Sequence, residues 1–598
     1  MLWELGVGGW ELTKAASFSG LHPMDNQAIA RVFAQIGDLL EIKAENPFKI
    51  RAYRNAAETI THTAERIADL NPADRLAIPG IGKDLAAKIA ELLETGTIAY
   101  HQNLLQEFPP TILDLLNLQG VGPKTVALLY RELRIGTLDQ LRVALQEGRL
   151  RGIKGMGAKK EALILKALDD QSRFTGRRLM PQAHDAIAPL VLALRDHAPN
   201  ATITPVGSLR RGCETCGDLD ILAAGAPPSL MDAFTSYGPV ENVLARGGTK
   251  SSVHMWGGFQ VDLRLVPEES LGAALQYFTG SKAHNIALRD RAIRMGLKLN
   301  EYGLYREDGS SIAGASEEEI YEALGLAFVP PELRENRGEI DAAEGRTLPS
   351  LVTQQDLRGD VHMHTTATDG KADAETMAIA ARGNGSSYIA ITDHSQALAM
   401  AGGLDEHAAL EHAARVRALN ARLDGITVLA GIECDIRPDG TMDLADDCLA
   451  QLDVVVASVH SAFNQDEAQM TDRILKAIAC PWVDILGHPT GRLILRRGGY
   501  PLNMEKVIAA AAAAGVALEI NSQVDRLDLD EHHARLACER GVQLVIDSDA
   551  HSPVALGNAR WGVTVARRAW LTKDDVLNTR PVDEFRRALR RRRRRGAA

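Results

Sequence analysis

The sequence predicts a multidomain protein in which helical segments come first, an α/β domain follows and a parallel β/α barrel comes last. Three observations support this division. Hairpins of the form apolar-x-Gly-x-Gly open helical segments near the N-terminus, and alternating strands in the middle of the chain carry aspartates. After residue 358, apolar strands that end in His, Asp or Glu alternate with Ala-rich helical stretches, which is typical of a parallel barrel. The 598 residues accommodate roughly three to five domains.

Composition narrows the class of protein. The hydrophobic fraction of 45% is ample for folded cores, and the sequence holds no run of about 18 apolar residues that could cross a membrane. The six cysteines lack zinc-finger spacing, and Cys213 and Cys216 form a C-x-x-C without a second pair. We therefore expect no disulfides and a cytoplasmic location. The net charge of −11 does not suit a simple DNA-coating protein, so charge must be unevenly distributed or offset by metal ions.

The N-terminal part begins with residues 1–23, which lack the features of a signal peptide and are expected to be a disordered extension or an over-long gene prediction. Helical periodicity starts at Met24. Between Phe48 and Arg54, three cations and a tyrosine share one helix. Considered alone, this run is most simply a solvated basic face.

Three Gly-rich segments, at residues 78–83, 118–124 and 153–159, share one local design. Their glycines let backbone N–H groups approach a phosphate, and the dipole of the following helix favours the negative charge. The design resembles the helix-hairpin-helix motif, which grips DNA backbones without reading sequence. The alternative is that the glycines serve tight packing alone. The residues expected to contact DNA are Gly80, Gly82, Lys83, Gly120, Gly122, Lys124, Gly155 and Gly157.

The α/β part centres on Asp218 and Asp220, which alternation places on one face of a short strand. Two adjacent carboxylates resist joint ionisation unless a cation lies between them. Considered alone, such a pair more often belongs to an edge strand whose aspartates are simply solvated. Here, however, a turn with Gly207 and Ser208 precedes two arginines and makes an anion site. The combination indicates metal-dependent phosphoryl or nucleotidyl transfer.

A second strand, residues 259–266, adds a third carboxylate, Asp262, as two-metal catalysis needs. The run 207–222 resembles the active-site motif of family X DNA polymerases, in the nucleotidyltransferase superfamily, and the likeness continues through residues 277–289. The resemblance implies that the three aspartates are catalytic and hold two Mg²⁺ or Mn²⁺ ions. It also implies contacts to the triphosphate, the sugar and the nascent base pair. The triphosphate contacts come from Gly207, Ser208, Arg211 and Gly217. The sugar contacts come from Tyr277, Phe278 and Gly280, and those near the base pair from Asn285 and Arg289.

The same resemblance places Lys49 and Tyr53 in a 5′-phosphate pocket, as an alternative to the solvated basic face. Two positions depart from the family pattern. Lys282 stands where the vertebrate repair enzyme has an acidic residue, and Asp84 stands where members that remove 5′-deoxyribose phosphate have a lysine, so we expect little lyase activity. The implied divisions are an N-terminal 8-kDa-like domain at 24–100, helix-hairpin-helix fingers at 101–175, a palm at 176–266, a thumb at 267–335 and a linker at 336–357.

In the C-terminal part, residues 358–575, metal-ligand side chains end successive apolar strands. His, Asp and Glu are ligands of Zn²⁺, Mn²⁺ and Fe²⁺. The set resembles the PHP (polymerase and histidinol phosphatase) domain, a distorted seven-stranded (β/α)7 barrel with a trinuclear metal centre. The resemblance implies up to three Zn²⁺ or Mn²⁺ ions, with Glu433 and His460 essential for catalysis. The nine implied ligands are His362, His364, Asp369, His394, Glu433, His460, His488, Asp549 and His551.

Residues 576–598 are Arg-rich near their end and are expected to form a basic tail with sequence-independent affinity for DNA. As a whole, the sequence resembles bacterial family X DNA polymerases with a C-terminal PHP domain. The resemblance implies a monomeric DNA-directed DNA polymerase that uses dNTPs to fill gapped or nicked DNA in base excision repair. It also implies a metal-dependent phosphoesterase acting as a 3′–5′ exonuclease, 3′-phosphatase or AP endonuclease. One alternative is that the barrel is a metal-stabilised docking platform without catalysis. Another is that the first half is a DNA-binding scaffold, against which the three aspartates argue.

Overall fold

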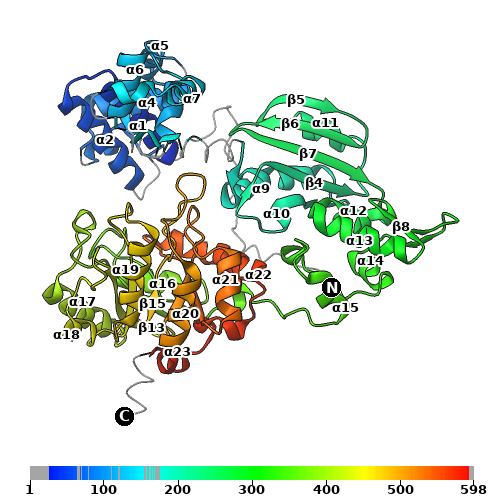
Figure 1. Ribbon diagram of the computed structural model, residues 1–598. Helices are drawn as coiled ribbons and strands as arrows, with labels where there is room; N and C mark the ends of the chain where they lie inside the picture. The colour runs from blue at the N-terminus through cyan, green and yellow to red at the C-terminus, as the bar shows by residue number, and fades with distance from the viewer. Residues whose placement is uncertain are drawn as a thin grey trace. The chain divides into compact units, whose positions relative to one another are not determined.

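The computed structural model describes residues 26–590, except 63–66, 69, 79, 110, 119–120, 154–155, 158–159, 163, 166–167 and 169–175. The chain divides into two compact units, Met1–Arg173 and Phe174–Ala598 (Figure 1). The expected extension at residues 1–23 lies outside the described residues. So do Gly120, Gly155 and residues 591–598 of the predicted tail.

The first unit is helical, as its sequence periodicity predicts. Apolar residues at helical spacing meet in one core, where Phe33, Leu39 and Leu129 are fully buried. Gly82 and Gly122 are the extended residues that precede α4 and α6, so two of the predicted hairpins enter their helices with the same backbone geometry. The elements are α1 (Asn26–Ile42), α2 (Pro47–His62), α3 (Pro72–Ala77), α4 (Lys83–Thr95), α5 (Ala99–Gln106), η1 (Ile112–Asn117), α6 (Pro123–Leu133), α7 (Leu138–Gln146) and η2 (Arg149–Gly152).

The second unit begins with a five-stranded palm sheet in the order β2-β4-β7-β6-β5. Alternation along β4 sends Leu219 and Ile221 into the core formed with α9 and α11, and sends Leu222 and Ala224 toward α12 on the other face. The aspartates of β4 share the face of Leu222. The elements are α9 (Met180–His197), β2 (Thr202–Pro205), α10 (Gly207–Arg210), β4 (Asp218–Ala224), α11 (Leu230–Thr235), β5 (Val240–Arg246), β6 (Lys250–Met255) and β7 (Phe259–Val266). A short pair, β1 (Arg178–Leu179) and β3 (Thr215–Cys216), stands apart from this sheet.

The thumb surrounds a three-stranded sheet, β10-β9-β8. Buried His284 joins its helices, because one ring nitrogen lies 2.7 Å from Glu339 Oε1 and the other 2.8 Å from the Tyr321 hydroxyl. The segment 336–357, expected to be a linker, contains α15 and the fully buried Ala343, so it packs on the thumb. The elements are α12 (Leu271–Thr279), α13 (Lys282–Arg294), β8 (Leu297–Asn300), β9 (Gly303–Arg306), β10 (Ser311–Ala313), α14 (Glu317–Ala323) and α15 (Glu339–Glu344).

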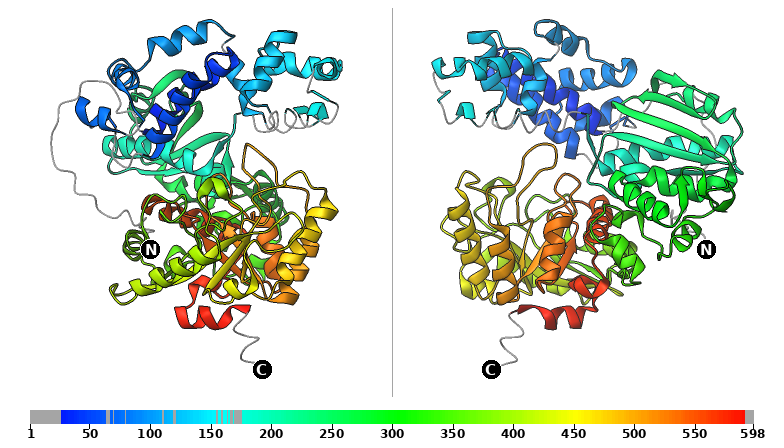
Figure 2. Two further views of the ribbon diagram at one scale, coloured as in Figure 1. Left: turned by 90° about the vertical axis from the view of Figure 1, so that its left-hand side faces the viewer. Right: turned by 45° about the vertical axis from the view of Figure 1, so that its right-hand side comes forward.

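The last part is the predicted barrel, seven parallel strands in the order β11 to β17. A parallel bridge between Met363 and Ala550 joins the segments that follow the first and last strands. Helices surround the strands (Figure 2). The strands are β11 (Gly359–Asp360), β12 (Tyr388–Ile391), β13 (Thr427–Asp435), β14 (Val454–Ser458), β15 (Ile485–Leu486), β16 (Ala517–Asn521) and β17 (Leu544–Asp547). The main helices are α16 (Ala374–Gly383), α17 (Glu406–Leu419), α18 (Asp446–Leu449), α19 (Glu467–Ala479), α20 (Met504–Ala514), α21 (Glu531–Glu539), α22 (Ala559–Arg568) and α23 (Val582–Ala588).

Helix α23 closes the end of the barrel at which the strands begin. Phe585 and Leu589 pack against Tyr388, the first residue of β12, and against the first residues of other strands. Arg590, which is 4% exposed, donates to the carbonyls of Ile478 and Cys480. The described beginning of the predicted basic tail is therefore part of the barrel packing.

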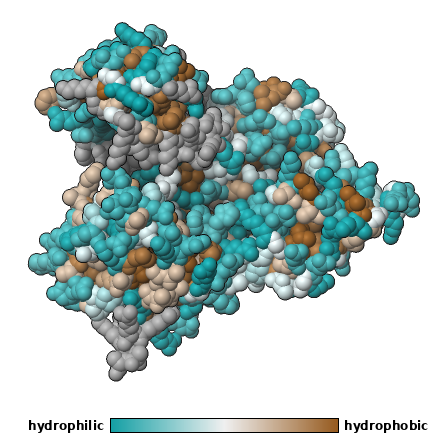
Figure 3. Space-filling model, in the orientation of Figure 1, coloured by the Kyte–Doolittle hydropathy of each residue, from teal (hydrophilic) through white to brown (hydrophobic). Residues whose placement is uncertain are grey.

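No helix among the described residues is long and apolar enough to cross a membrane. On the face shown in Figure 3, hydrophobic residues form small groups among hydrophilic ones. All six cysteines are free thiols, as their spacing predicts.

Candidate active sites

The three aspartates predicted to hold metal ions lie together on the palm sheet. Asp218 begins β4, and parallel pairing sets Asp220 directly opposite Asp262 of β7. A Cβ at Gly207 would lie 2.9 Å from Asp220 Oδ2, and the φ of +68° at this residue favours glycine. The turn predicted to cradle a phosphate therefore borders the carboxylates.

The charges around these aspartates indicate a cation site. Burial and the neighbouring carboxylates of Asp218 and Asp262 raise the pKa of Asp220 to about 6. Burial would also raise the pKa of Asp262, but hydrogen bonds from Lys250 and two other side chains lower it. Lys250 Nζ lies 2.7 Å from Asp262 Oδ2. One ammonium thus compensates one of three carboxylates, and the group can accept further positive charge.

The two arginines after the turn have different partners. Arg210 makes hydrogen bonds of 3.0 and 2.6 Å to the two oxygens of Glu317, which links the palm to the thumb. Arg211, predicted to contact the triphosphate, donates from Nε to Glu335 Oε1 at 2.9 Å and from Nη1 to the carbonyl of Thr279 at 2.5 Å. Its guanidinium is therefore held in one orientation beside the turn.

The other predicted nucleotide contacts gather around the end of α12. The rings of Tyr277 and Phe278 meet edge to face, with centroids 5.1 Å apart. Arg211 Nη1 lies 3.2 Å from the position that a Cβ of Gly280 would take. The Asn285 amide donates to the Tyr277 carbonyl at 2.7 Å, so this side chain is tied to its own domain. Among the rest, Ser208 and Gly217 are partly exposed, and Lys282 and Arg289 are exposed.

In the barrel, all nine predicted ligands converge where the strands end. His488 Nε2 lies 2.9 Å from Glu433 Oε1. His488 and Asp549 have φ values of +26° and +50°, conformations that are uncommon for non-glycine residues and that cluster at functional sites. The other eight form three overlapping groups whose ligand atoms lie within 4.8 Å of one another: His364, Asp369, His394 and His551; His362, His364 and Asp549; and His394, Glu433 and His460.

Glu433 lies at the centre of this arrangement and is 1% exposed. Its Oε1 faces three histidine rings and its Oε2 faces two others, so the carboxylate can bridge two ions. The five ring nitrogens, at 2.8 to 3.6 Å, belong to His362, His364, His394, His460 and His488.

The buried nitrogens fit a metal centre better than a hydrogen-bonded core. His362 Nε2 and His364 Nε2 have no hydrogen-bond partner of acceptable geometry among the described atoms, although Asp549 Oδ1 lies 3.7 and 3.1 Å away. A buried nitrogen without a partner is costly. Nitrogen and oxygen atoms that face a common point form the donor set of Zn²⁺ or Mn²⁺.

The pKa values of the cluster depend on its internal charges. Burial alone would lower the pKa values of His460 and His394, but the carboxylate of Glu433 raises them to about 9 and about 10. Burial would raise the pKa of Glu433, but the surrounding histidines hold it well below its usual range. Protons on histidines thus compensate the buried carboxylates, and a bound metal would displace them.

Two carboxylates that orient ligands were not predicted from the sequence. Glu519 Oε1 accepts a hydrogen bond from His362 Nδ1 at 2.6 Å, and its Oε2 accepts one from the His488 backbone N–H at 2.5 Å. Asp435 Oδ1 lies 3.2 Å from His460 Nδ1. A carboxylate on Nδ1 fixes the tautomer that leaves Nε2 free to bind a metal.

A sequence signal for these carboxylates exists. Asp435 follows Glu433 by two residues on β13, and Glu519 and Asn521 are two residues apart on β16. Residues i and i+2 of a strand share a face, so these side chains point toward the same centre. Asn521 Nδ2 donates to Asp549 Oδ2 at 3.0 Å, which orients another ligand.

In the helical unit, Tyr53 is 3% exposed and packs against Tyr100, with ring centroids 6.1 Å apart. Exposed Lys49 places its Nζ 4.7 Å from the Tyr100 centroid. Asp84, at the family's lysine position, forms an ion pair of 2.5 Å with Lys88 one helical turn later. Described and exposed residues of the hairpins are Gly80, Gly82, Lys83, Gly122, Lys124 and Gly157.

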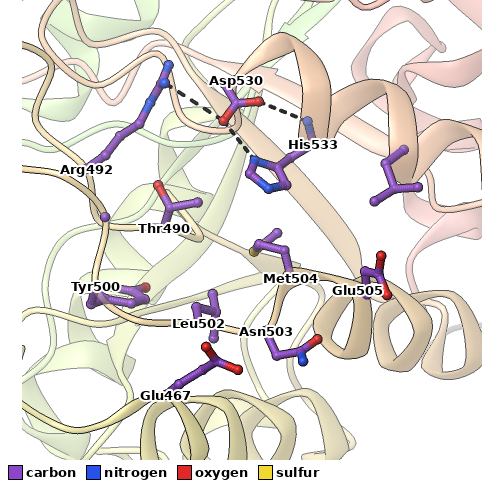
Figure 4. A pocket seen from close by; sticks show the side chains of 12 residues that line it. Glu467, Thr490, Arg492, Tyr500, Leu502, Asn503, Met504, Glu505, Asp530 and His533 are labelled. Atoms are coloured by element: carbon purple, nitrogen blue, oxygen red, sulfur yellow. Dashed lines mark hydrogen bonds and ion pairs between the residues drawn. The ribbon is translucent and has the colours of Figure 1, made fainter.

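A cavity of about 550 Å³ lies in the barrel domain between the loop after His488 and the starts of α20 and α21 (Figure 4). None of the nine ligands lines it. Among its charged groups, Asp530 Oδ2 lies 2.8 Å from His533 Nδ1 and 3.9 Å from Arg492. We therefore assign it no role in the chemistry.

Helical hairpins, an α/β sheet with three carboxylates beside a Gly-Ser turn, and a parallel barrel with nine ligands define a nucleic-acid polymerase joined to a metal-dependent hydrolase domain. Comparisons with known families agree with this class. Residues 274–335 match the DNA polymerase beta thumb, and residues 360–523 match the PHP domain. Residues 24–98 match a helix-hairpin-helix domain, and residues 112–170 match a SAM-like helix-hairpin-helix tandem.

The chain is 37% identical over 572 residues to the DNA polymerase/3′-5′ exonuclease PolX of Bacillus subtilis (strain 168), covering 95% of this chain and 100% of the relative. The barrel is also similar to a probable phosphatase of Shewanella sp. (strain MR-4), with 34% identity over 37% of this chain and 88% of the relative. A probable phosphatase of Thermoanaerobacter sp. (strain X514) is 32% identical over 37% of this chain and 89% of the relative. The chain belongs to the family X DNA polymerases that carry a C-terminal PHP domain.

Proposed function

We propose that this polymerase fills short gaps during base excision repair and that its barrel is an active phosphoesterase that trims 3′ ends. The convergence of the nine predicted ligands, in the same chain as the palm carboxylates, carries the proposal. The relative in Bacillus subtilis is named as a polymerase and 3′-5′ exonuclease, and the shorter relatives as probable phosphatases. We extend both kinds of activity to this chain.

In the palm, Asp218, Asp220 and Asp262 would hold two Mg²⁺ or Mn²⁺ ions. At both sites, bound divalent ions would neutralise phosphate charge and polarise the bond that breaks. The chain itself holds the nucleotide: the Gly207 turn presents backbone N–H groups, and Arg211 presents guanidinium N–H groups, to the triphosphate. Further contacts would come from Ser208, Gly217, Tyr277, Phe278, Gly280, Asn285 and Arg289.

In the barrel, the nine predicted ligands, Glu433 among them, would hold up to three Zn²⁺ or Mn²⁺ ions. Glu519 and Asp435 keep the ligand rings in the metal-binding tautomer. The reaction would be hydrolysis of a phosphodiester by a 3′–5′ exonuclease or AP endonuclease, or of a phosphomonoester by a 3′-phosphatase. The alternative is a metal-stabilised docking platform.

The partners would be gapped or nicked DNA and dNTPs. The exposed backbone at Gly82 and Gly122, with Lys83 and Lys124 beside it, would contact DNA phosphates without reading sequence. We propose that the protein is monomeric and cytoplasmic, the latter in keeping with its free thiols.

One preparation tests both activities. With gapped DNA, dNTPs and Mg²⁺, the primer should be extended. Without dNTPs and with Mn²⁺, its 3′ end should be shortened. Metal content is measured on the same sample. Metal-loaded protein that extends primers but cleaves no DNA end would support the docking platform instead.

A further inference from the structure

The barrel domain reaches the polymerase site through α22 (Ala559–Arg568). A Cβ at Gly212 would lie 2.3 Å from Thr564 Cγ2, so glycine allows this helix to pack directly on the loop after the phosphate-binding turn. The last residue of the helix, Arg568, enters that loop. Its Nη1 donates to the backbone carbonyl of Arg211 at 2.7 Å.

Arg568 also shares a carboxylate with the side chain of Arg211. Its Nη1 lies 3.1 Å from Glu335 Oε1, the oxygen that accepts from Arg211 Nε at 2.9 Å. Its Nη2 lies 3.0 Å from Glu531 Oε1 of α21. The Arg568 side chain is 5% exposed and that of Glu335 is 16% exposed, so solvent screens these charge-assisted bonds only weakly.

These contacts fix both the backbone and the guanidinium of Arg211. Glu335 holds Nε and the Thr279 carbonyl holds Nη1. Because a guanidinium has five N–H groups, others on the same fork can still meet phosphate oxygens. Arg568 supports this orientation at two points, the Arg211 carbonyl and the Glu335 carboxylate.

We propose that Arg568, a side chain of the hydrolase domain, is a positioning residue for nucleotide addition. It holds Arg211 in the orientation that receives the triphosphate of the incoming dNTP, so the polymerase site is completed by the barrel domain. This inference rests on the proposed function, in which Arg211 contacts the triphosphate. Loss of Arg568 weakens dNTP binding and leaves hydrolysis of DNA ends unchanged.

The test measures KM for dTTP and kcat on a one-nucleotide gap opposite dA, with the full-length protein. Arg568→Ala should raise KM by about tenfold with kcat changed by less than about threefold, since it removes charge-assisted hydrogen bonds that support ground-state binding. Arg568→Lys should recover part of the loss. The matched control is Arg567→Ala, which breaks the adjacent pair with Glu332, 2.8 Å long, on the same helix and outside the Arg211 network. It should leave KM unchanged.

Arg211→Ala separates this inference from the proposed function. If Arg211→Ala does not raise KM, the proposed triphosphate contact is wrong. If it does, and Arg568→Ala behaves like Arg567→Ala, the positioning role is wrong. If Arg568→Ala does not fold, as judged by thermal unfolding, Arg568→Lys and Glu335→Gln decide. Coupling between these two substitutions in KM supports the inference, and independent, additive effects overturn it.

Discussion

The palm and barrel sites share carboxylates, to which the barrel adds histidines, and they differ in how far the protein alone completes them. In the barrel, ring nitrogens and carboxylate oxygens form groups within 4.8 Å, and Glu519 and Asp435 orient the rings from behind. In the palm, Asp220 and Asp262 lie opposite each other on two strands, and Lys250 compensates part of their charge. In the part of the chain that the structure describes, the palm carboxylates form no comparable group of three.

The difference reflects what each site must bind. A hydrolytic centre keeps its metals between reactions, so its ligands can be fixed by packing and by hydrogen bonds from other side chains. A polymerase site shares its metals with a nucleotide that arrives and leaves, so part of the coordination comes from phosphate oxygens. The palm therefore presents its carboxylates on adjacent strands beside an anion-binding turn, while the barrel buries most of its predicted ligands.

The sharpest division between the sites is expected from Asp262→Ala. Removing this carboxylate should reduce nucleotide addition by about 10³-fold, because the metals lose a shared ligand, and should leave 3′-end hydrolysis intact. Primer extension and degradation are measured on one preparation. Asp232→Ala, which removes a palm carboxylate paired with Arg246, is the control and should leave both activities intact. Equal loss of both activities in folded Asp262→Ala would contradict two independent sites.

The converse is expected from Glu433→Gln. The amide keeps the shape of the side chain but cannot bridge two cations, so hydrolysis should fall by about 10²–10³-fold, with a lower metal content and near-normal primer extension. His460→Gln should act in the same direction. Glu411→Gln, on the exposed face of α17, controls for loss of an acid. If Glu433→Gln hydrolyses DNA ends at the normal rate, the nuclease lies elsewhere.

Sequence periodicity was sufficient to place side chains on faces and strand ends. Alternation placed Asp218 and Asp220 on one face, and the barrel ligands were predicted to follow successive apolar strands. All nine barrel ligands then meet in space, because parallel strands bring their carboxyl ends to one rim. The three palm aspartates also come together. Their roles in catalysis and nucleotide binding stay predictions.

Contacts between distant segments were beyond sequence reasoning. Arg211 and Glu335 are paired across domains, and Arg568 joins them from the end of the barrel domain. Nothing local in any of the three segments specifies such a partner. Glu519 was missed for another reason, since its spacing of two residues from Asn521 on one strand was not used.

A smaller effect is expected from Glu519→Gln. Glu519 accepts one hydrogen bond from His362 and another from the His488 backbone N–H, one at each carboxylate oxygen. In the glutamine, the NH2 group would replace one of these oxygens and would face an N–H donor instead of accepting from it. Metal affinity of the barrel should fall about 10–100-fold, as judged by competition with a chelator, and excess metal should restore hydrolysis. Glu539→Gln, an exposed acid of α21, is the control. Unchanged metal affinity would show that the ligands are fixed without Glu519.

The smallest effect concerns the helical unit, in which Asp84, at the family's lysine position, forms an ion pair with Lys88. A Schiff base requires a free amine, whereas the Lys88 amine lies 2.5 Å from the Asp84 carboxylate. Lys83 is exposed and precedes Asp84 by one residue. Since one residue turns a helical side chain by about 100°, Lys83 points in a different direction from the family's lysine position. We therefore expect little removal of 5′-deoxyribose phosphate, measured as borohydride-trapped DNA adduct.

Asp84→Asn should increase trapping if the ion pair is what restrains Lys88, and Lys88→Ala in that background should abolish the gain. Strong trapping by the unaltered protein would refute the expectation, and its loss in Lys83→Ala rather than Lys88→Ala would make Lys83 the nucleophile.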